Sequence, residues 1–109
     1  MGLLTSSAIT NNHNLYFSKD ELEKILKLYS KGVSRGEWKD YAIDFDKNNA
    51  FFYIFKHSFA SPDCVLNKYL ERKRKKIFYF LISKKFKKKF ENLDKLISDL
   101  NRMTLKVVN

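Results

Sequence analysis

Two groups of cationic side chains flank one short apolar stretch in the second half of the chain. The first group is Arg72, Lys73, Arg74, Lys75 and Lys76, and the second is Lys84, Lys85, Lys87, Lys88 and Lys89. The stretch between them, residues 77–82, contains three aromatic side chains in succession. Cations beside aromatic rings suit nucleic-acid binding, in which lysines neutralise phosphates and bases stack on rings. These cations are therefore the candidate nucleic-acid-binding residues, with RNA or DNA as the partner.

The specificity of such a site is low. The sequence contains no RNP-type, KH or helix-turn-helix signature. Contacts made mainly by lysine predict binding that is sensitive to salt and indifferent to base sequence. Phe78, Tyr79 and Phe80 form a core in one interpretation and a stacking platform in the other, and we expect the core.

The net charge of +10 is concentrated in one segment. Residues 1–54 carry seven Lys and Arg and seven Asp and Glu, whereas residues 68–89 carry eleven Lys and Arg and one acid, Glu71. Such asymmetry indicates an acidic partner. Lys outnumbers Arg by 18 to 4, however, which is also typical of solvated surfaces encoded by AT-rich genomes. In that alternative the lysines serve solubility only.

The residues that could carry catalysis are few. His57 and Cys64 flank a turn at Pro62, but nothing near them in sequence lowers a thiol pKa. If Asp40, Asp44 and Asp46 lie on one strand they share a face, which could form a weak cation site or an acid pair. A solvent-exposed strand face followed by a turn explains the same residues. The sequence has no phosphate-cradling glycine loop and only three glycines in all, which argues against nucleotide hydrolysis. We predict no catalytic residue, no metal and no cofactor.

An amphipathic helix is predicted from Ser18 onwards. Ser18 and Glu21 form a capping box, and apolar residues follow at helical spacing. Gly32 is expected to end the helix in a left-handed conformation, with Val33 folding back on Leu28.

A β-hairpin is predicted next, over residues 36–57. Tyr41, Ile43 and Phe45 alternate with smaller or polar residues, and residues 46–49 favour a chain reversal. We expect these three side chains to pack, together with Trp38, on the apolar stripe of the helix. Residues 50–55 are apolar throughout, which predicts a central strand covered on both faces.

The second half of the chain predicts more strands and a second helix. Residues 64–71 and 77–82 are expected to be strands, joined by an exposed connection at residues 72–76. Residues 84–91 fit a strand or a helix, and their lysines favour a twisted edge strand. Asn92 is a potential cap for a helix with an apolar stripe from Leu93 to Leu100. Residues 104–108 favour a short final strand.

One part of this pattern resembles a known family. The residues concerned are Phe17-x-x-x-Glu21-Leu22-x-x-Ile25-Leu26-x-x-Tyr29, followed by Gly36-Glu37-Trp38-x-Asp40-Tyr41-Ala42-Ile43-Asp44-Phe45. They resemble a small family of alphaproteobacterial domains of unknown function. The resemblance is dense over residues 17–57 and implies a compact α+β domain in a bacterial cytoplasm. It implies no activity.

The sequence thus predicts an α+β fold: a helix, an antiparallel meander of four to five strands, and a C-terminal helix packed on the same sheet. Residues 1–15 are expected to be a disordered tail and residues 16–109 a single domain. The apolar runs are too short to span a membrane, and we expect a cytoplasmic protein. The predicted function is a non-enzymatic module that binds nucleic acid through residues 72–89. The alternative is a protein-interaction or homodimer module that uses an uncovered sheet face.

Overall fold

The described part of the chain folds as one helix, five strands and a second helix. The computed structural model describes residues 14–57 and 61–108, with side chains as far as residue 103, so most of the predicted tail lies outside the described residues. The elements are α2 (Lys19–Ser34), β2 (Asp40–Phe45), β3 (Asn49–Phe55), β4 (Cys64–Glu71), β5 (Lys76–Ser83), β6 (Lys87–Phe90) and α3 (Leu93–Val108).

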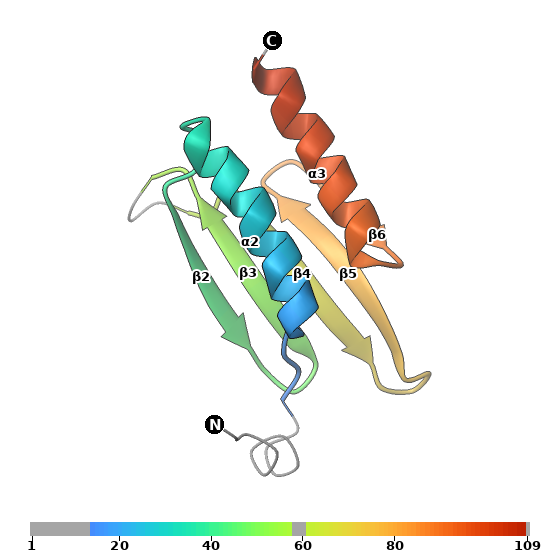
Figure 1. Ribbon diagram of the computed structural model, residues 1–109. Helices are drawn as coiled ribbons and strands as arrows, with labels where there is room; N and C mark the ends of the chain where they lie inside the picture. The colour runs from blue at the N-terminus through green and yellow to red at the C-terminus, as the bar shows by residue number, and fades with distance from the viewer. Residues whose placement is uncertain (1–13, 58–60, 109) are drawn as a thin grey trace.

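The five strands form one antiparallel meander in the order β2-β3-β4-β5-β6. Both helices lie on the same face of this sheet (Figure 1), and the predicted α+β fold is confirmed. The ambiguous segment at residues 84–91 contains the edge strand β6, as its lysines indicated. The strand expected at residues 104–108 is wrong, because α3 continues to Val108. Extending an existing helix adds one hydrogen bond per residue, and this gain outweighs the β-propensity of Thr and Val.

Side chains cap both helices at their N-termini. The hydroxyl of Ser18 accepts a hydrogen bond from the Glu21 N–H at 3.1 Å, and the Glu21 carboxylate accepts one from the Ser18 N–H at 2.7 Å. The predicted capping box is therefore confirmed. At the start of α3, the side-chain oxygen of Asn92 accepts a hydrogen bond from the Lys95 N–H at 2.9 Å.

Gly32 does not end α2, contrary to the prediction. The helix continues to Ser34, and the glycine with positive φ is Gly36, at +76°. Gly32 is buried because the indole of Trp38 lies directly against it, and a Cβ atom at this position would sit 2.1 Å from Cε3 of Trp38. Val33 is exposed and does not fold back. Gly32 is thus required for close packing rather than for its backbone freedom.

The core lies between the helices and one face of the sheet. On the sheet, its centre is a row of three side chains on neighbouring strands: Phe52 is paired with Leu66, and Leu66 with Leu81. These three side chains are fully buried, together with Ile25 of α2 and Leu96 of α3. The expectation that residues 50–55 are covered on both faces is wrong, because burial alternates along β3. The helices cover only the face that carries Ala50, Phe52 and Ile54.

The strand β2 lies at the edge of the sheet and is largely exposed. Tyr41, Ile43 and Phe45 keep 41%, 44% and 41% of their surface in solvent, so the prediction that they belong to the core is wrong. Tyr41 packs on Phe52 and Tyr29 with centroids 4.9 and 5.0 Å apart, and Phe45 packs on Tyr16 at 4.5 Å. The helix α2 crosses in front of the inner strands and leaves this edge uncovered (Figure 1).

Replacing Gly32 with Ala should destabilise the fold by about 1–3 kcal/mol, because the new methyl group would overlap the Trp38 ring. In an unpacked helix the same change is stabilising by about 0.5–1 kcal/mol. Urea unfolding measures the difference, with Ser30→Ala on the exposed side of α2 as the control. A stabilised Gly32→Ala variant would show that Trp38 does not pack on the helix.

The stability losses of Phe52→Ala and Phe45→Ala should distinguish a core position from an edge position. Phe52→Ala removes a fully buried ring and should cost roughly 3–5 kcal/mol. Phe45→Ala removes a ring with 41% exposure and should cost nearer 1 kcal/mol. Equal losses of melting temperature in the two variants would contradict the edge position of Phe45.

Candidate nucleic-acid interface

The sheet face opposite the helices, called the open face below, carries no helix within the part of the chain that the structure describes. Successive residues of a strand point to opposite faces, so the neighbours of the core residues point here. One register row runs from Phe51 through Asn67 and Phe80 to Lys89, across β3, β4, β5 and β6. Other side chains of this face are Tyr53, Val65, Tyr69, Phe78, Ile82 and Lys87.

Three lysines of the two predicted groups meet on the open face. The ammonium groups of Lys76 and Lys89 lie over the ring of Phe78, at 5.3 and 3.8 Å from its centroid. The ammonium group of Lys87 lies 4.8 Å from the centroid of Phe80. The hairpin β4–β5 and the strand β6 therefore bring together cations from both sides of residues 77–82. The attraction of each cation to its ring holds the head group beside the aromatic surface.

The other seven predicted cations lie elsewhere. Lys88 points to the helix side, where it pairs with Asp99 at 3.2 Å. Arg72 donates hydrogen bonds to Asn48 and to the Lys47 carbonyl, and Arg74 pairs with Glu71. The remaining four are exposed on the turn after β4 or around the bend before β6: Lys73, Lys75, Lys84 and Lys85.

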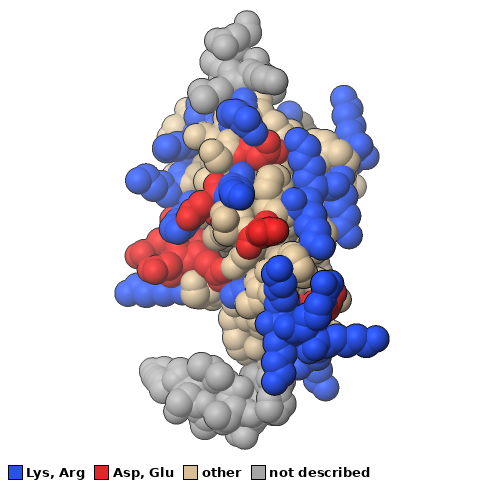
Figure 2. Space-filling view, turned by 90° about the vertical axis from the view of Figure 1, so that its right-hand side faces the viewer, with Lys and Arg blue, Asp and Glu red and all other residues tan. Residues whose placement is uncertain are grey.

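The positive charge is displayed along one side of the molecule. Figure 2 views the side on which β5, β6 and the β4–β5 turn lie in Figure 1, and it shows Lys and Arg gathered along this edge and around the turn. The turn also borders a surface hollow of about 530 Å³, lined in part by Tyr69, Arg72 and Lys73. The cationic edge is therefore continuous with a concave surface.

The rings next to these lysines are only partly covered. Phe51 and Tyr53 stack with centroids 5.7 Å apart, and Tyr69 meets Phe80 edge-on at 6.3 Å. All four are half-buried, whereas Phe78 is only 6% exposed beneath its two lysines. The expected core role holds for Tyr79, which packs on the helix side, but Phe80 belongs to the open face.

Acidic residues lie at the opposite edge of the same face. Asp40 and Asp44 of β2 are separated from the lysines of β6 by three strands. Burial raises the pKa of the Tyr53 hydroxyl, and the charges of Asp44 and Asp46 raise it further. Apart from Glu71, which lies opposite Lys76 at the end of β4, the open face therefore has a positive rim at β6, rings in the middle and a negative rim at β2.

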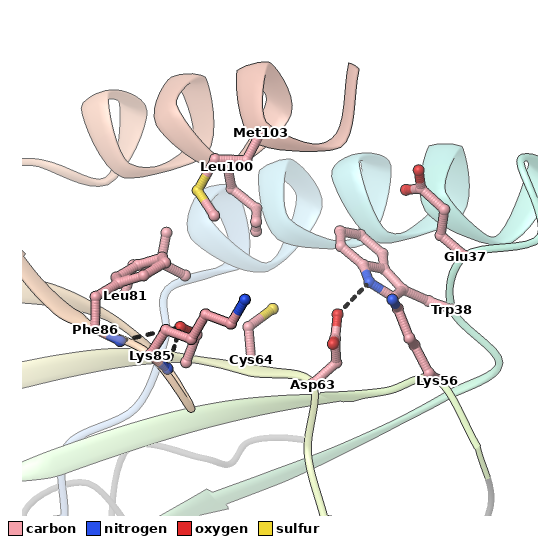
Figure 3. Close-up of a pocket in the computed structure, with 11 residues that line it drawn as sticks. Glu37, Trp38, Lys56, Asp63, Cys64, Leu81, Lys85, Phe86, Leu100 and Met103 are labelled. Atoms are coloured by element: carbon pink, nitrogen blue, oxygen red, sulfur yellow. Dashed lines mark hydrogen bonds between the residues drawn. The ribbon is translucent and has the colours of Figure 1, made fainter. Parts of the chain in front are cut away.

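The helix side of the sheet contains a separate pocket of about 330 Å³ (Figure 3). The Trp38 indole N–H donates to Asp63 at 3.2 Å, and Cys64 lies beside them. Burial raises the pKa of the Cys64 thiol to about 12, so the thiol is protonated at neutral pH. His57 is exposed at the end of β3. Among the described side chains, no cluster of His, Cys, Asp and Glu has the arrangement of a metal site.

A family model described as a protein of unknown function, DUF2794, matches residues 15–96. The chain belongs to the DUF2794 family. No curated protein and no solved structure matches it. The predicted membership of a family of unknown function is confirmed, and the match spans α2, the whole sheet and the start of α3. Neither helix of the described chain is long and apolar enough to cross a membrane.

A buried ion pair fixes the orientation of the central strands in this DUF2794 domain. The ammonium group of Lys68 donates to the Glu21 carboxylate and to the Tyr16 carbonyl, at 2.8 Å each, and the Tyr79 hydroxyl donates to the second Glu21 oxygen. Lys68 and Tyr79 are opposite each other in register. Because both point to α2, their neighbours Asn67, Phe78 and Phe80 point to the open face.

The sequence interpretation missed the open-face rings of Phe51, Tyr53 and Tyr69 in the DUF2794 domain. The pattern of residues 64–71 predicts a strand with mixed faces, and the structure buries both Asn67 and Lys68. The Asn67 amide group donates to the Asn49 side chain and the Ala50 carbonyl, at 3.2 Å each. A useful signal was the short connection at residues 72–75, which places Glu71 opposite Lys76 and hence Asn67 opposite Phe80.

The Glu21 contacts predict a pH-dependent stability. Burial alone would raise the pKa of the Glu21 carboxyl, but hydrogen bonds from Lys68, Tyr79 and the Ser18 N–H hold it below its ordinary value of 4.5. The stabilisation is therefore complete above pH 4.5 and is lost as the pH falls through the lower folded value. Glu21→Gln should lose roughly 2 kcal/mol at neutral pH.

Denaturant unfolding between neutral and acidic pH tests this pair, with Glu23→Gln on the exposed side of α2 as the control. The difference between the parent protein and Glu21→Gln should shrink below pH 4.5, where the parent loses its charge. A difference that stays constant across this range would contradict the ionic contribution of Glu21.

Proposed function

We propose that this domain is a non-enzymatic, cytoplasmic module that binds nucleic acid through the open face. The observation that carries the proposal is the position of Lys76, Lys87 and Lys89 over Phe78 and Phe80. Lysine head groups near the half-buried rings of Phe80 and Tyr69 match the two recurring contacts of nucleic-acid binders, phosphate neutralisation and base stacking. A net charge of +10, concentrated around the same hairpin, attracts a polyanion from a distance.

A second copy of the chain is the alternative occupant. A two-fold axis parallel to the strands would place the Asp40 and Asp44 rim of one copy opposite the Lys87 and Lys89 rim of the other. Exposed rings also favour a protein interface. Two copies with ten net positive charges each repel one another, however, and this repulsion favours nucleic acid.

Binding to labelled single-stranded RNA should weaken steeply with salt. Three phosphates held by three lysines predict a slope of about −2 in log K against log salt, since each contributes about −0.7. The variant K76Q/K87Q/K89Q should lose most of the binding in fluorescence anisotropy. The control K27Q/K31Q/K95Q removes the same charge from exposed positions on the two helices and should retain the binding.

The alternative gives a different result in light scattering. A homodimer would keep its mass at high salt and dissociate when Val65→Glu places a charge in the middle of the open face. Equal losses of RNA affinity in the two lysine triples would show that net charge, rather than the open face, holds the RNA. A monomer that does not retain RNA or DNA at low salt would overturn both functions.

A further inference from the structure

The lysines of the open face form a line parallel to β6. Lys87 and Lys89 are alternate residues of one strand, so their Cα atoms are about 6.8 Å apart along the edge. Lys76 continues the line toward the β4–β5 turn, because it shares the Phe78 ring with Lys89. The hollow beside Tyr69, Arg72 and Lys73 lies at that end of the sheet. Cations in such a row suit successive phosphates of an extended chain.

The accessible rings all lie on one side of this line. Moving inward from β6, the open face presents Phe80 on β5, then Tyr69 on β4, then Phe51 and Tyr53 on β3. Each is half-buried and therefore keeps part of its ring in solvent. A ligand held by its phosphates at the β6 rim can thus turn its bases inward over these rings.

The negative rim restricts the ligand to this half of the sheet. Asp40 and Asp44 lie on β2, four strand spacings from β6, or about 19 Å. Phosphates crossing the sheet toward β2 would approach these carboxylates and be repelled. At the β6 rim they are about two Debye lengths away at physiological salt, where the repulsion is screened.

A duplex cannot use the rings in this way. Its bases are stacked on one another and their faces are hidden, so only its phosphates and groove edges reach a flat sheet. Unpaired bases, in contrast, can stack on aromatic side chains whatever their sequence.

We infer that the ligand is a single strand of nucleic acid whose backbone runs along β6, parallel to the strand, with its bases turned inward over Phe80 and Tyr69. This inference rests on the proposed function and narrows it to a ligand class and a path. RNA and DNA single strands share the chemistry it requires, and separate binding assays with each distinguish the two sources.

The test compares a labelled single strand of RNA, the matching strand of DNA, and duplexes of the same length, by anisotropy on the full chain at one salt concentration. Single strands should bind roughly tenfold more tightly than duplexes, because only they gain base stacking. Phe80→Leu should weaken single-strand binding roughly tenfold and leave duplex binding unchanged. The matched control Phe86→Leu removes a ring that lies under Lys88 on the helix side, and it should bind as the parent does. Circular dichroism melting confirms that both variants fold.

The path has a test of its own. Asp44→Asn should change single-strand affinity less than about twofold if the backbone follows β6, since the screened distance is long. A several-fold gain would show that the strand crosses to β2 and would overturn the path. Equal affinity for single strands and duplexes would overturn the single-strand inference while leaving nucleic-acid binding intact. Absence of binding to every probe at low salt would instead remove the proposed function itself.

Discussion

Beneath the first turn of α2, the carboxylate of Glu21 joins the helix to two neighbouring strands. It accepts hydrogen bonds from the Ser18 N–H and from the Tyr79 hydroxyl, and it pairs with the buried ammonium group of Lys68. Side chains alternate along a strand, so a shift of one residue would exchange the two faces of the sheet. Such a shift would bury Phe80 and Asn67 under the helix and leave Lys68 and Tyr79 on the open face. The Glu21 contacts thus fix which face receives the rings.

A buried ion pair is not in itself evidence of high stability, because the loss of hydration opposes the attraction between the charges. Its better-supported effect is specificity: an unpaired Lys68 in the core would be costly, so alternative registers that leave it without Glu21 are excluded. In this protein the pair excludes the packing that would hide the aromatic side of β5. The residue that stabilises the helix N-terminus therefore also determines which surface of the sheet is left open.

The open face would be an unfavourable surface if its rings were bare. The ammonium groups of Lys87 and Lys89 lie over the rings of Phe80 and Phe78, so these side chains shield apolar area without closing the face. The lysines also discourage pairing of β6 with another sheet edge. The same three lysines therefore suit both solubility and the proposed binding, and this explains why composition alone left both interpretations open. Lys88 carries the same charge but points to the other side of the sheet, where it pairs with Asp99.

Local patterns in the sequence determined the elements. The Ser18–Glu21 capping box, the Asn92 cap, the alternation in the strands and the lysines of the edge strand each depend on nearby residues, and the structure contains all of them. Tertiary structure decided which face of each strand was covered. Residues 77–82 are apolar on both sides, and Lys68 is a cation on the buried side. Period-2 alternation therefore did not show which face of these two strands is buried. Gly32 was misread for the same reason, because its role depends on Trp38 packing against it in space. The meeting of Lys76 with Lys89 on one ring likewise requires β4, β5 and β6 to be paired, since these two cations are far apart along the chain.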